Sequence, residues 1–191
     1  MKKIFLSVAA LVIVASSFAQ ATTWKSDKYH SQLKFDITHL MVSTVEGSFT
    51  DFDATIVTTK PDFSDAVYTL TAKSASVNTG EDPRDTHLKS ADFFDVVTFP
   101  TLTFTSTKLE KVSDGKYKLT GNLTIHGVTK SVVLDLWYRG TVANPMNKKP
   151  VAGFKITGSI NRSDFGLGAK FPSAMLSDEV DLDAEGEFNP Q

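Results

Sequence analysis

Apolar and polar residues alternate along most of the chain. Leu33, Phe35 and Ile37 fall on one face of an extended segment, and the residues between them are charged. A period of two is typical of a β-strand that buries one face. The same pattern predicts further strands, whose inward faces carry Tyr68, Leu70 and Ala72; Leu102 and Phe104; Tyr117, Leu119, Leu123 and Ile125; Val132, Leu134, Leu136 and Tyr138; Phe154 and Ile156; and Val180, Leu182 and Ala184.

Turn residues between these segments predict that neighbouring strands are antiparallel. Asp114 and Gly115 separate two alternating runs, and His126 and Gly127 separate the next two. Glycine at such positions suits the tight turns of β-hairpins. About eight strands with no helices between them fit either a closed barrel or a two-layer sandwich, and periodicity alone does not separate the two. Long runs joined by tight turns favour the barrel, so the predicted fold class is all-β.

One segment, residues 82–95, breaks the alternation. Asp82 followed by Pro83 is typical of a helix start, with Asp82 as the N-cap and proline in the first turn. We therefore expect short helical turns near residues 82–95. A second break, residues 144–150, is a polar stretch rich in Asn, Pro and Lys, which predicts a connecting loop.

The first residues have the parts of a secretory signal peptide. Two lysines are followed by the apolar run 4–14 and by small residues. The apolar run is too short to span a bilayer. We assign residues 1–19 to a signal peptide cut after Ala19, with a cut after Ala21 as the alternative, and residues 20–191 to one domain. The mature protein is then expected in the periplasm or outside the cell.

Composition and charge argue against several classes of function. The chain has no cysteine, and therefore no disulfide, thiolate nucleophile or sulfur ligand for a metal. Lys and Arg total 20 against 22 Asp and Glu, and the scattered charges argue against a nucleic-acid surface. The four histidines stand far apart, without the spacing of a metal site. No nucleophile elbow, phosphate loop or dinucleotide motif occurs, so we expect a binding protein without catalytic residues, metal or cofactor.

A charged cluster lies in the segment that breaks the strand pattern. Arg84, Asp85 and His87 place a cation, an anion and a titratable ring there, which suits the mouth of a barrel. We predict that these residues, with His30 and Arg162, form the polar end of a binding site. Arg84 would bind a phosphate or a carbonyl oxygen. The alternative is that Arg84 and Asp85 only satisfy each other and nearby backbone.

Short motifs follow one another along the chain in a familiar order. They include Tyr29-His30-Ser31, Gly47-Ser48-Phe49, Ser76-Val77-Asn78-Thr79-Gly80, Arg84-Asp85-Thr86-His87-Leu88, Asp92-Phe93-Phe94-Asp95, Gly121-Asn122-Leu123-Thr124-Ile125-His126-Gly127 and Arg162-Ser163-Asp164-Phe165-Gly166-Leu167. In this order they resemble the YceI-like family of bacterial polyisoprenoid-binding proteins, over nearly the whole chain after the signal segment. Residues 175–179 depart from the family, which usually has a glycine-bearing turn before the last strand.

The resemblance implies an extended lipocalin-like barrel that binds rather than catalyses. Its pore would hold a polyisoprenoid or the tail of an isoprenoid quinone. Among the inward residues, Ala72, Gly121 and Gly158 would leave space for such a chain. We predict that the ligand contacts Leu33, Phe35, Ile37, Tyr68, Leu70, Leu102, Phe104, Leu119, Leu123, Ile125, Leu134, Leu136, Phe154 and Ile156.

The leading hypothesis is a periplasmic or secreted carrier or reservoir whose partner is a long-chain apolar lipid. One alternative is a binder of another amphiphile such as a fatty acid. Two others are an enzyme acting on an isoprenoid diphosphate and a filled β-domain with a structural role. We expect no nucleic-acid partner and no stable membrane insertion, and we leave open whether the chain forms a homodimer.

Overall fold

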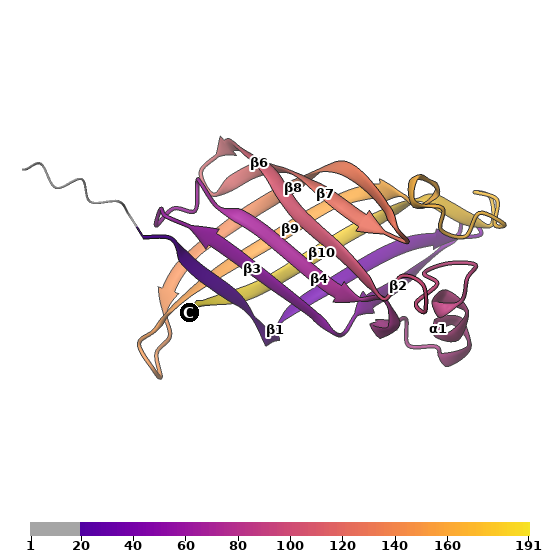
Figure 1. Cartoon of the computed structure of the whole chain (residues 1–191), viewed down its shortest axis with the longest axis horizontal. Helices are drawn as coiled ribbons and strands as arrows, with labels where there is room; N and C mark the ends of the chain where they lie inside the picture. Colours follow the sequence, from indigo (N-terminus) through magenta and orange to yellow (C-terminus); the bar gives the residue numbers. More distant parts are fainter. Residues whose placement is uncertain (1–19) are drawn as a thin grey trace, which may run out of the picture.

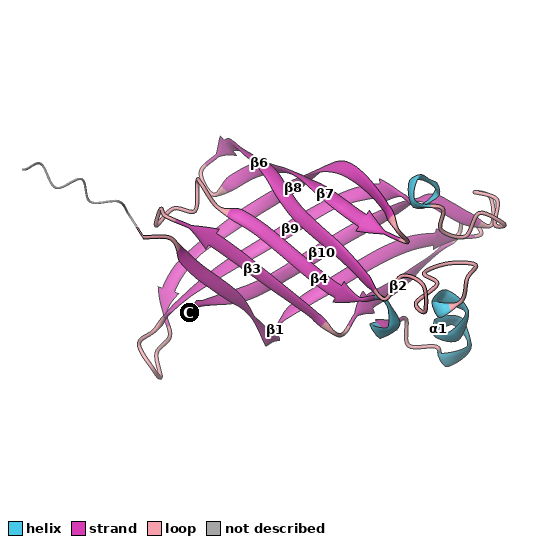
Figure 2. Cartoon of the chain, in the orientation of Figure 1, coloured by secondary structure: helices cyan, strands magenta, loops and turns pink. Residues whose placement is uncertain are grey.

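Strands make up most of residues 20–191, the part of the chain that this computed structural model describes. The predicted signal peptide, residues 1–19, lies outside the described residues. The strands are β1 (Thr22–His39), β2 (Ser43–Phe49), β3 (Phe52–Thr58), β4 (Val67–Lys73), β5 (Val77–Asn78), β6 (Thr101–Ser113), β7 (Lys116–Ile125), β8 (Val128–Ala143), β9 (Pro150–Asn161) and β10 (Leu176–Pro190). Helical segments are short: η1 (Ser74–Ser76), α1 (Asp82–Lys89) and η2 (Arg162–Phe165). The all-β prediction is confirmed (Figure 2).

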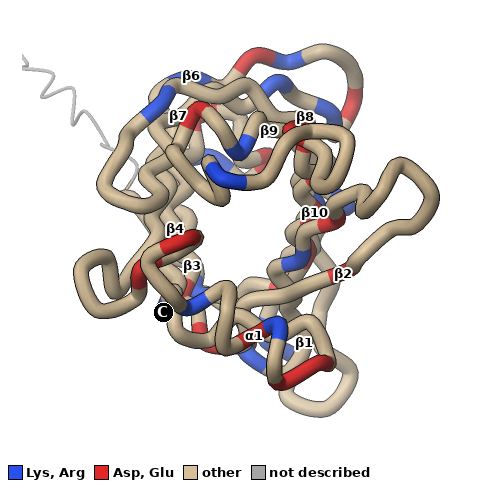
Figure 3. Tube along the Cα trace, turned by 90° about the vertical axis from the view of Figure 1, so that its right-hand side faces the viewer, with Lys and Arg blue, Asp and Glu red and all other residues tan. Residues whose placement is uncertain are grey.

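The sheet closes into a barrel of eight antiparallel strands. The hydrogen-bonded order is β10-β9-β8-β7-β6-β4-β3-β1, and β1 pairs in turn with β10. The strands run obliquely around a long axis (Figure 1), and viewed along that axis they form a ring (Figure 3). The predicted barrel is confirmed, and the sandwich alternative is wrong. Strands β2 and β5 lie outside the ring order, because β2 pairs with the second half of β1 and β5 pairs with β2.

Strand β1 changes partner halfway along its length. It pairs with β3 up to Lys25, opposite Thr55, and with β2 only from Lys34, opposite Ser48. Residues 26–33 therefore have no strand partner on that side, although Ser31 and the residues after it keep their pairing with β10. We call this break in the hydrogen-bonded wall the seam.

The two predicted hairpins and the predicted helix occur where the turn residues stand. Gly115 and Gly127 have φ angles of 69° and 73°, the left-handed region that glycine enters without strain. They join β6 to β7 and β7 to β8. Helix α1 contains proline in its first turn, as predicted, but its N-cap is Glu81 rather than Asp82, and no side chain caps it. No helix among residues 20–191 has the length and apolarity needed to cross a bilayer.

The turn between β3 and β4 lies at the barrel end opposite α1 (Figure 1), and an aromatic cluster closes that end. Phe63 comes from the turn between β3 and β4 and is almost completely buried. Its ring lies 5.1 Å from that of Trp24, 5.0 Å from Tyr138 and 5.0 Å from Phe154, between ring centroids. Phe188 packs edge-on against Phe154. We call this cluster the plug. Since rings at such distances leave no gap for a ligand, the barrel interior is accessible only from elsewhere.

Candidate functional site

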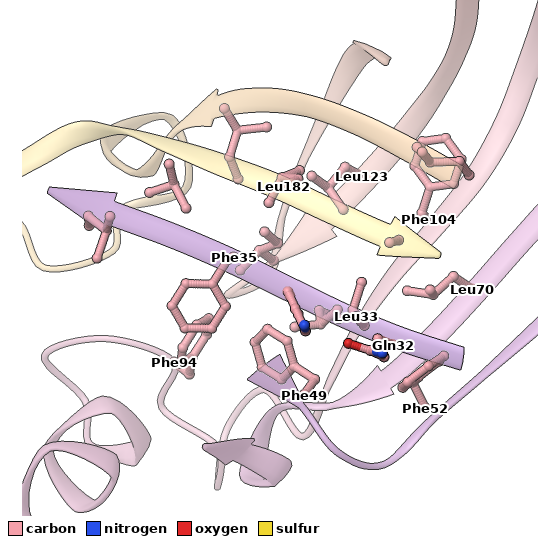
Figure 4. A pocket seen from close by; sticks show the side chains of 18 of the residues that line it. Gln32, Leu33, Phe35, Phe49, Phe52, Leu70, Phe94, Phe104, Leu123 and Leu182 are labelled. Carbon is pink, nitrogen blue, oxygen red and sulfur yellow. The ribbon is translucent and has the colours of Figure 1, made fainter. Parts of the chain in front are cut away.

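A cavity of about 410 Å³ occupies the barrel between the plug and α1. This volume falls in the range of roughly 300–1,000 Å³ that is typical of small-molecule sites. Its wall is formed almost entirely by apolar side chains, drawn from strands around the whole ring. Figure 4 shows some of them: Phe35 from β1, Leu70 from β4, Phe104 from β6, Leu123 from β7 and Leu182 from β10. Such a wall can pack against a hydrocarbon chain, and it offers few hydrogen-bonding groups to a ligand.

Most of the side chains predicted to contact the ligand lie on this wall. The cavity is lined by Leu33, Phe35, Ile37, Tyr68, Leu70, Leu102, Phe104, Leu123, Ile125, Leu134, Phe154 and Ile156. Leu119 and Leu136 also face inward, but they are fully buried within the packed core and do not line the cavity. Alternation gives the face of a strand correctly, whereas it carries no information about depth along the barrel axis. Ligand contact by the lining residues remains a prediction.

The expectation that small inward residues leave space for the ligand is wrong. A side chain at Gly121 would overlap the ring of Phe104, and one at Gly158 would overlap Leu134. Ala72 is fully buried in the core and does not line the cavity. These small residues let large neighbours lie flat against the sheet, so they shape the wall rather than widen the cavity.

Several wall residues escaped the sequence analysis because they come from short or irregular elements. Phe49 in β2 packs 5.8 Å from Phe35 and 5.4 Å from Phe94, between ring centroids. The Phe35 ring occupies the space where Gly47 has no side chain. The sequence signal that could have pointed to Phe49 is Gly47, which lies two residues before it on the same face of the strand. Leu182, on the predicted last strand, also lines the cavity but was not among the predicted ligand contacts.

Helix α1 forms one side of the cavity mouth, where Arg84 and His87 line it. The Arg84 guanidinium donates from Nε to Thr79 Oγ1 (2.7 Å) and from Nη2 to the Thr79 carbonyl (3.0 Å). Asp85 is buried and accepts from the Thr79 amide (2.8 Å) and hydroxyl (2.6 Å). Asp85 does not line the cavity, so its predicted place among the head-group residues is corrected: it holds the loop that positions Arg84.

The other two predicted head-group residues lie in different environments. His30 is largely exposed, with Nδ1 3.2 Å from Asp27 Oδ2, and it does not line the cavity. Arg162 does line it but is buried and donates to five backbone carbonyls, those of Leu167, Gly168, Phe171, Leu176 and Ser177. A guanidinium has five N–H donors, so Arg162 is occupied in holding the loop between β9 and β10. Of the five predicted head-group residues, only Arg84 and His87 lie at the cavity mouth as predicted.

A link between two loops lies beside His87. Asp92 Oδ2 is 3.4 Å from His87 Nε2, and Asp92 Oδ1 accepts from Lys170 Nζ at 2.6 Å. These partners, Lys170 first, lower the pKa of the Asp92 carboxyl. The Phe93 ring stacks on Phe171 at 5.3 Å, between the same two loops. Two loops that contact each other therefore border the mouth.

The cavity also reaches the seam. Gln32 and Lys34 point outward by strand alternation, yet both line the cavity, Gln32 within the seam and Lys34 where the pairing with β2 begins. Figure 4 shows Gln32 on the same side of the cavity as Phe52. The side chain of Gln32 makes no hydrogen bond within the part of the chain that the structure describes.

Tyr68 places a polar atom in the mainly apolar interior. Its hydroxyl is buried and has no hydrogen-bond partner among residues 20–191. Burial raises the pKa of this phenol, so it stays neutral. A hydroxyl without a partner in this surrounding is a cost to stability rather than a contact that holds the fold.

Comparison with known sequences identifies a family and related bacterial proteins. The sequence model of the YceI-like domain matches residues 24–188. A UPF0312 protein of Staphylococcus aureus (strain bovine RF122) is 39% identical over 172 residues, which cover 88% of this chain and 98% of that protein. The family-model match runs from within β1 to within β10 and so takes in all or most of every strand of the barrel.

Comparison with solved structures agrees. The Campylobacter jejuni YCEI protein is 40% identical, with a TM-score of 0.74 over 81% of this chain and 90% of that one. Burkholderia cenocepacia BcnA (24% identity, TM-score 0.76, 85% and 98% covered) and a polyisoprenoid binding domain from Saccharophagus degradans (16%, 0.66, 88% and 98%) share the fold. The resemblance drawn from the motifs is confirmed: the chain belongs to the YceI-like family.

Proposed function

We propose that the protein is an exported carrier or reservoir that holds a polyisoprenoid, or the tail of an isoprenoid quinone, inside its barrel. The observation that carries this proposal is the apolar cavity of about 410 Å³, which is closed by the plug at one end and lined by strands around the whole ring. Burial of hydrocarbon there provides affinity at about 25 cal/mol per Å², reduced by the ordering of the ligand. The polyisoprenoid-binding description of the Saccharophagus degradans domain supports the same class of ligand.

The polar end of the ligand is proposed to lie at the mouth. Thr79 holds Arg84 through Nε and Nη2, which leaves Nη1 without a protein partner among the described residues. A guanidinium in this position favours a phosphate or carbonyl oxygen through charge-assisted hydrogen bonds. His87 lies on the same helix and also lines the cavity. The mouth therefore recognises the head group, while the wall accepts the tail. The protein acts by binding, without a chemical step.

The compartment follows from the predicted signal peptide. Removal of residues 1–19 would release the barrel into the periplasm or the medium. Charges of both signs are spread around the ring (Figure 3), which suits a protein that stays in solution while its cargo is enclosed.

Extraction of the native ligand tests the proposal. The full chain would be exported in a bacterial host, purified without detergent, extracted with organic solvent and examined by mass spectrometry. We expect one class of isoprenoid lipid. An extract that contains only fatty acids would favour the amphiphile alternative, and a lipid-free protein that also fails to bind added farnesol would contradict the carrier role.

A further inference from the structure

The turn between β1 and β2 exposes three consecutive large apolar side chains. Leu40, Met41 and Val42 are 52%, 75% and 84% exposed. We call these residues the apolar tip. Leu40 and Met41 also have left-handed backbone, with φ of 51° and 59°. Gly and Asn enter this region far more readily than Leu or Met. The turn thus keeps apolar side chains where both solvent and backbone geometry disfavour them, which points to a use outside the folded monomer.

The apolar tip lies at the mouth of the cavity. Its neighbour His39 lines the cavity, and so does Met175 from the loop before β10. The Leu40 amide donates to the Met175 carbonyl at 2.9 Å, so the two loops are joined at the rim. Met175 is itself exposed. Figure 1 shows this turn at the same end of the barrel as α1. The apolar tip therefore lies beside the rim of the cavity, to which it is joined through Met175.

The size of the apolar tip restricts its partner. Three exposed side chains on one turn offer only a small apolar surface. A stable protein interface buries roughly 1,200–2,000 Å², far more than this surface offers. Insertion into the headgroup boundary of a bilayer needs only a small apolar surface. Asp36 on β1 lies opposite Glu46 on β2 and Asp181 on β10. These three carboxylates would be repelled by a bilayer of anionic lipids.

We propose that the apolar tip docks the mouth of the barrel on a neutral lipid bilayer, so that an apolar chain moves between bilayer and cavity without crossing water. The proposal rests on the proposed function for its cargo. The docking itself needs only the tip. Binding is shallow and reversible, because one turn inserts while the charged outer wall stays in water.

Vesicle binding separates the tip from other exposed apolar residues. We would compare mature parent protein with the double variant Met41→Glu and Val42→Glu in cosedimentation with phosphatidylcholine vesicles. The matched control is Met146→Glu, since Met146 is 93% exposed in the loop between β8 and β9, at the opposite end of the barrel. We expect vesicle binding to fall about fivefold or more in the tip variant and to stay unchanged in the control. Binding of farnesol in solution should be unchanged in both variants, because neither changes a cavity residue.

The possible failures differ from one another. Equal losses in tip and control variants, or a parent that binds no vesicles, would overturn the docking proposal. Binding that requires anionic lipid would overturn the apolar insertion, and a parent dimer that the tip variant abolishes would assign the tip to a second copy of the chain. A parent that binds vesicles but not farnesol would retain the docking surface and contradict the proposed cargo.

Discussion

At the scale of single residues, the site combines side chains that are fixed by the fold with a few that remain free to act. Arg162 illustrates the first kind, because all its donors bind backbone carbonyls. Arg84 illustrates the second, because Thr79 holds it at the cavity mouth without occupying the whole guanidinium. The charge of an arginine was visible in the sequence, whereas its hydrogen-bond partners were not.

Arg84 is predicted to distinguish head groups. Charge-assisted hydrogen bonds contribute about 1.5–3 kcal/mol each, so Arg84→Ala should weaken binding of farnesyl phosphate roughly tenfold or more. Farnesol, with the same tail, should lose much less, and Arg84→Lys should retain part of the phosphate affinity. Titration by calorimetry would measure all three proteins. Equal losses for both ligands would show that Arg84 serves only the loop that carries Thr79.

Tyr68→Phe is predicted to leave the lipid-free protein as stable or to stabilise it by up to about 1 kcal/mol, because it removes a buried hydroxyl without a partner. Tyr117→Phe is the control, since the Tyr117 hydroxyl donates to the Asp62 carbonyl at 3.4 Å. Urea denaturation of both variants would measure the free energy of unfolding. A clear loss of stability for Tyr68→Phe alone would mean that its hydroxyl is satisfied in solution.

At the scale of elements, the turn between β3 and β4 closes one end of the barrel by placing Phe63 in it. Asp65 stabilises this turn by accepting hydrogen bonds from the hydroxyls of Thr58 and Thr59 and from the Thr59 amide. These bonds, the Thr58 hydroxyl first, lower the pKa of Asp65 to about 2. The ionised carboxylate therefore stabilises the folded state above the usual pKa of Asp, and this contribution is lost as the pH falls towards 2.

Asp65→Asn should lower the melting temperature at pH 7, and the difference from the parent should shrink as the pH falls from about 4 to about 2. Asp53→Asn, on the outer face of β3, is the control and should show little effect at either pH. Circular dichroism during thermal unfolding would measure the melting temperatures of the parent and both variants. A difference that grows towards acid pH would contradict the assigned direction.

The seam is predicted to give lateral access to the cavity. Since the chain contains no cysteine, Gln32→Cys introduces a single thiol at the seam, and Asn122→Cys introduces one on the outer face of β7. Both should react with a small thiol reagent, and saturating farnesol should slow only the thiol at position 32, by roughly tenfold. Mass spectrometry of modification would follow both rates. Equal rates with and without farnesol would show that the ligand does not reach the seam.

Elements differ in how far the sequence foretold them. Long alternating strands such as β7 and β8 were predicted because a half-buried strand imposes a period of two. The plug was not, because Phe63 stands in a turn between Pro61 and Ser64, where no period marks a buried side chain. Leu119 and Leu123 share a strand face but differ in depth, so only the structure separates core from cavity wall.

At the scale of the whole molecule, closure of the barrel depends on the pairing of the first strand with the last. Strand β1 pairs with β10 from Trp24, opposite Pro190, to His39, opposite Leu176. Periodicity could not foretell this pairing, because a sandwich has the same alternation. Long runs joined by tight turns favoured the barrel, and the resemblance of the motif order to a family implied it. Every strand of the ring therefore contributes side chains to the cavity wall.

A charge inside this wall should therefore empty the cavity. Leu123→Asp places a carboxylate beside Phe104, where desolvation costs several kcal/mol unless water enters. Lipid recovered from the purified variant should fall strongly. Val133→Asp, on the exposed outer face of β8, is the control and should load normally. Normal loading of a folded Leu123→Asp variant would show that β7 does not contact the lipid.

The plug closes one end of the barrel, and this fixes the order of events for a molecule that passes through the mouth. The end of a chain-like molecule that enters first lies deepest, beside Phe154 of the plug, and is the last to leave. A long molecule cannot turn round in so narrow a space, so donor and acceptor meet the same end of it. A donor membrane and an acceptor membrane would therefore both have to meet the mouth end of the barrel.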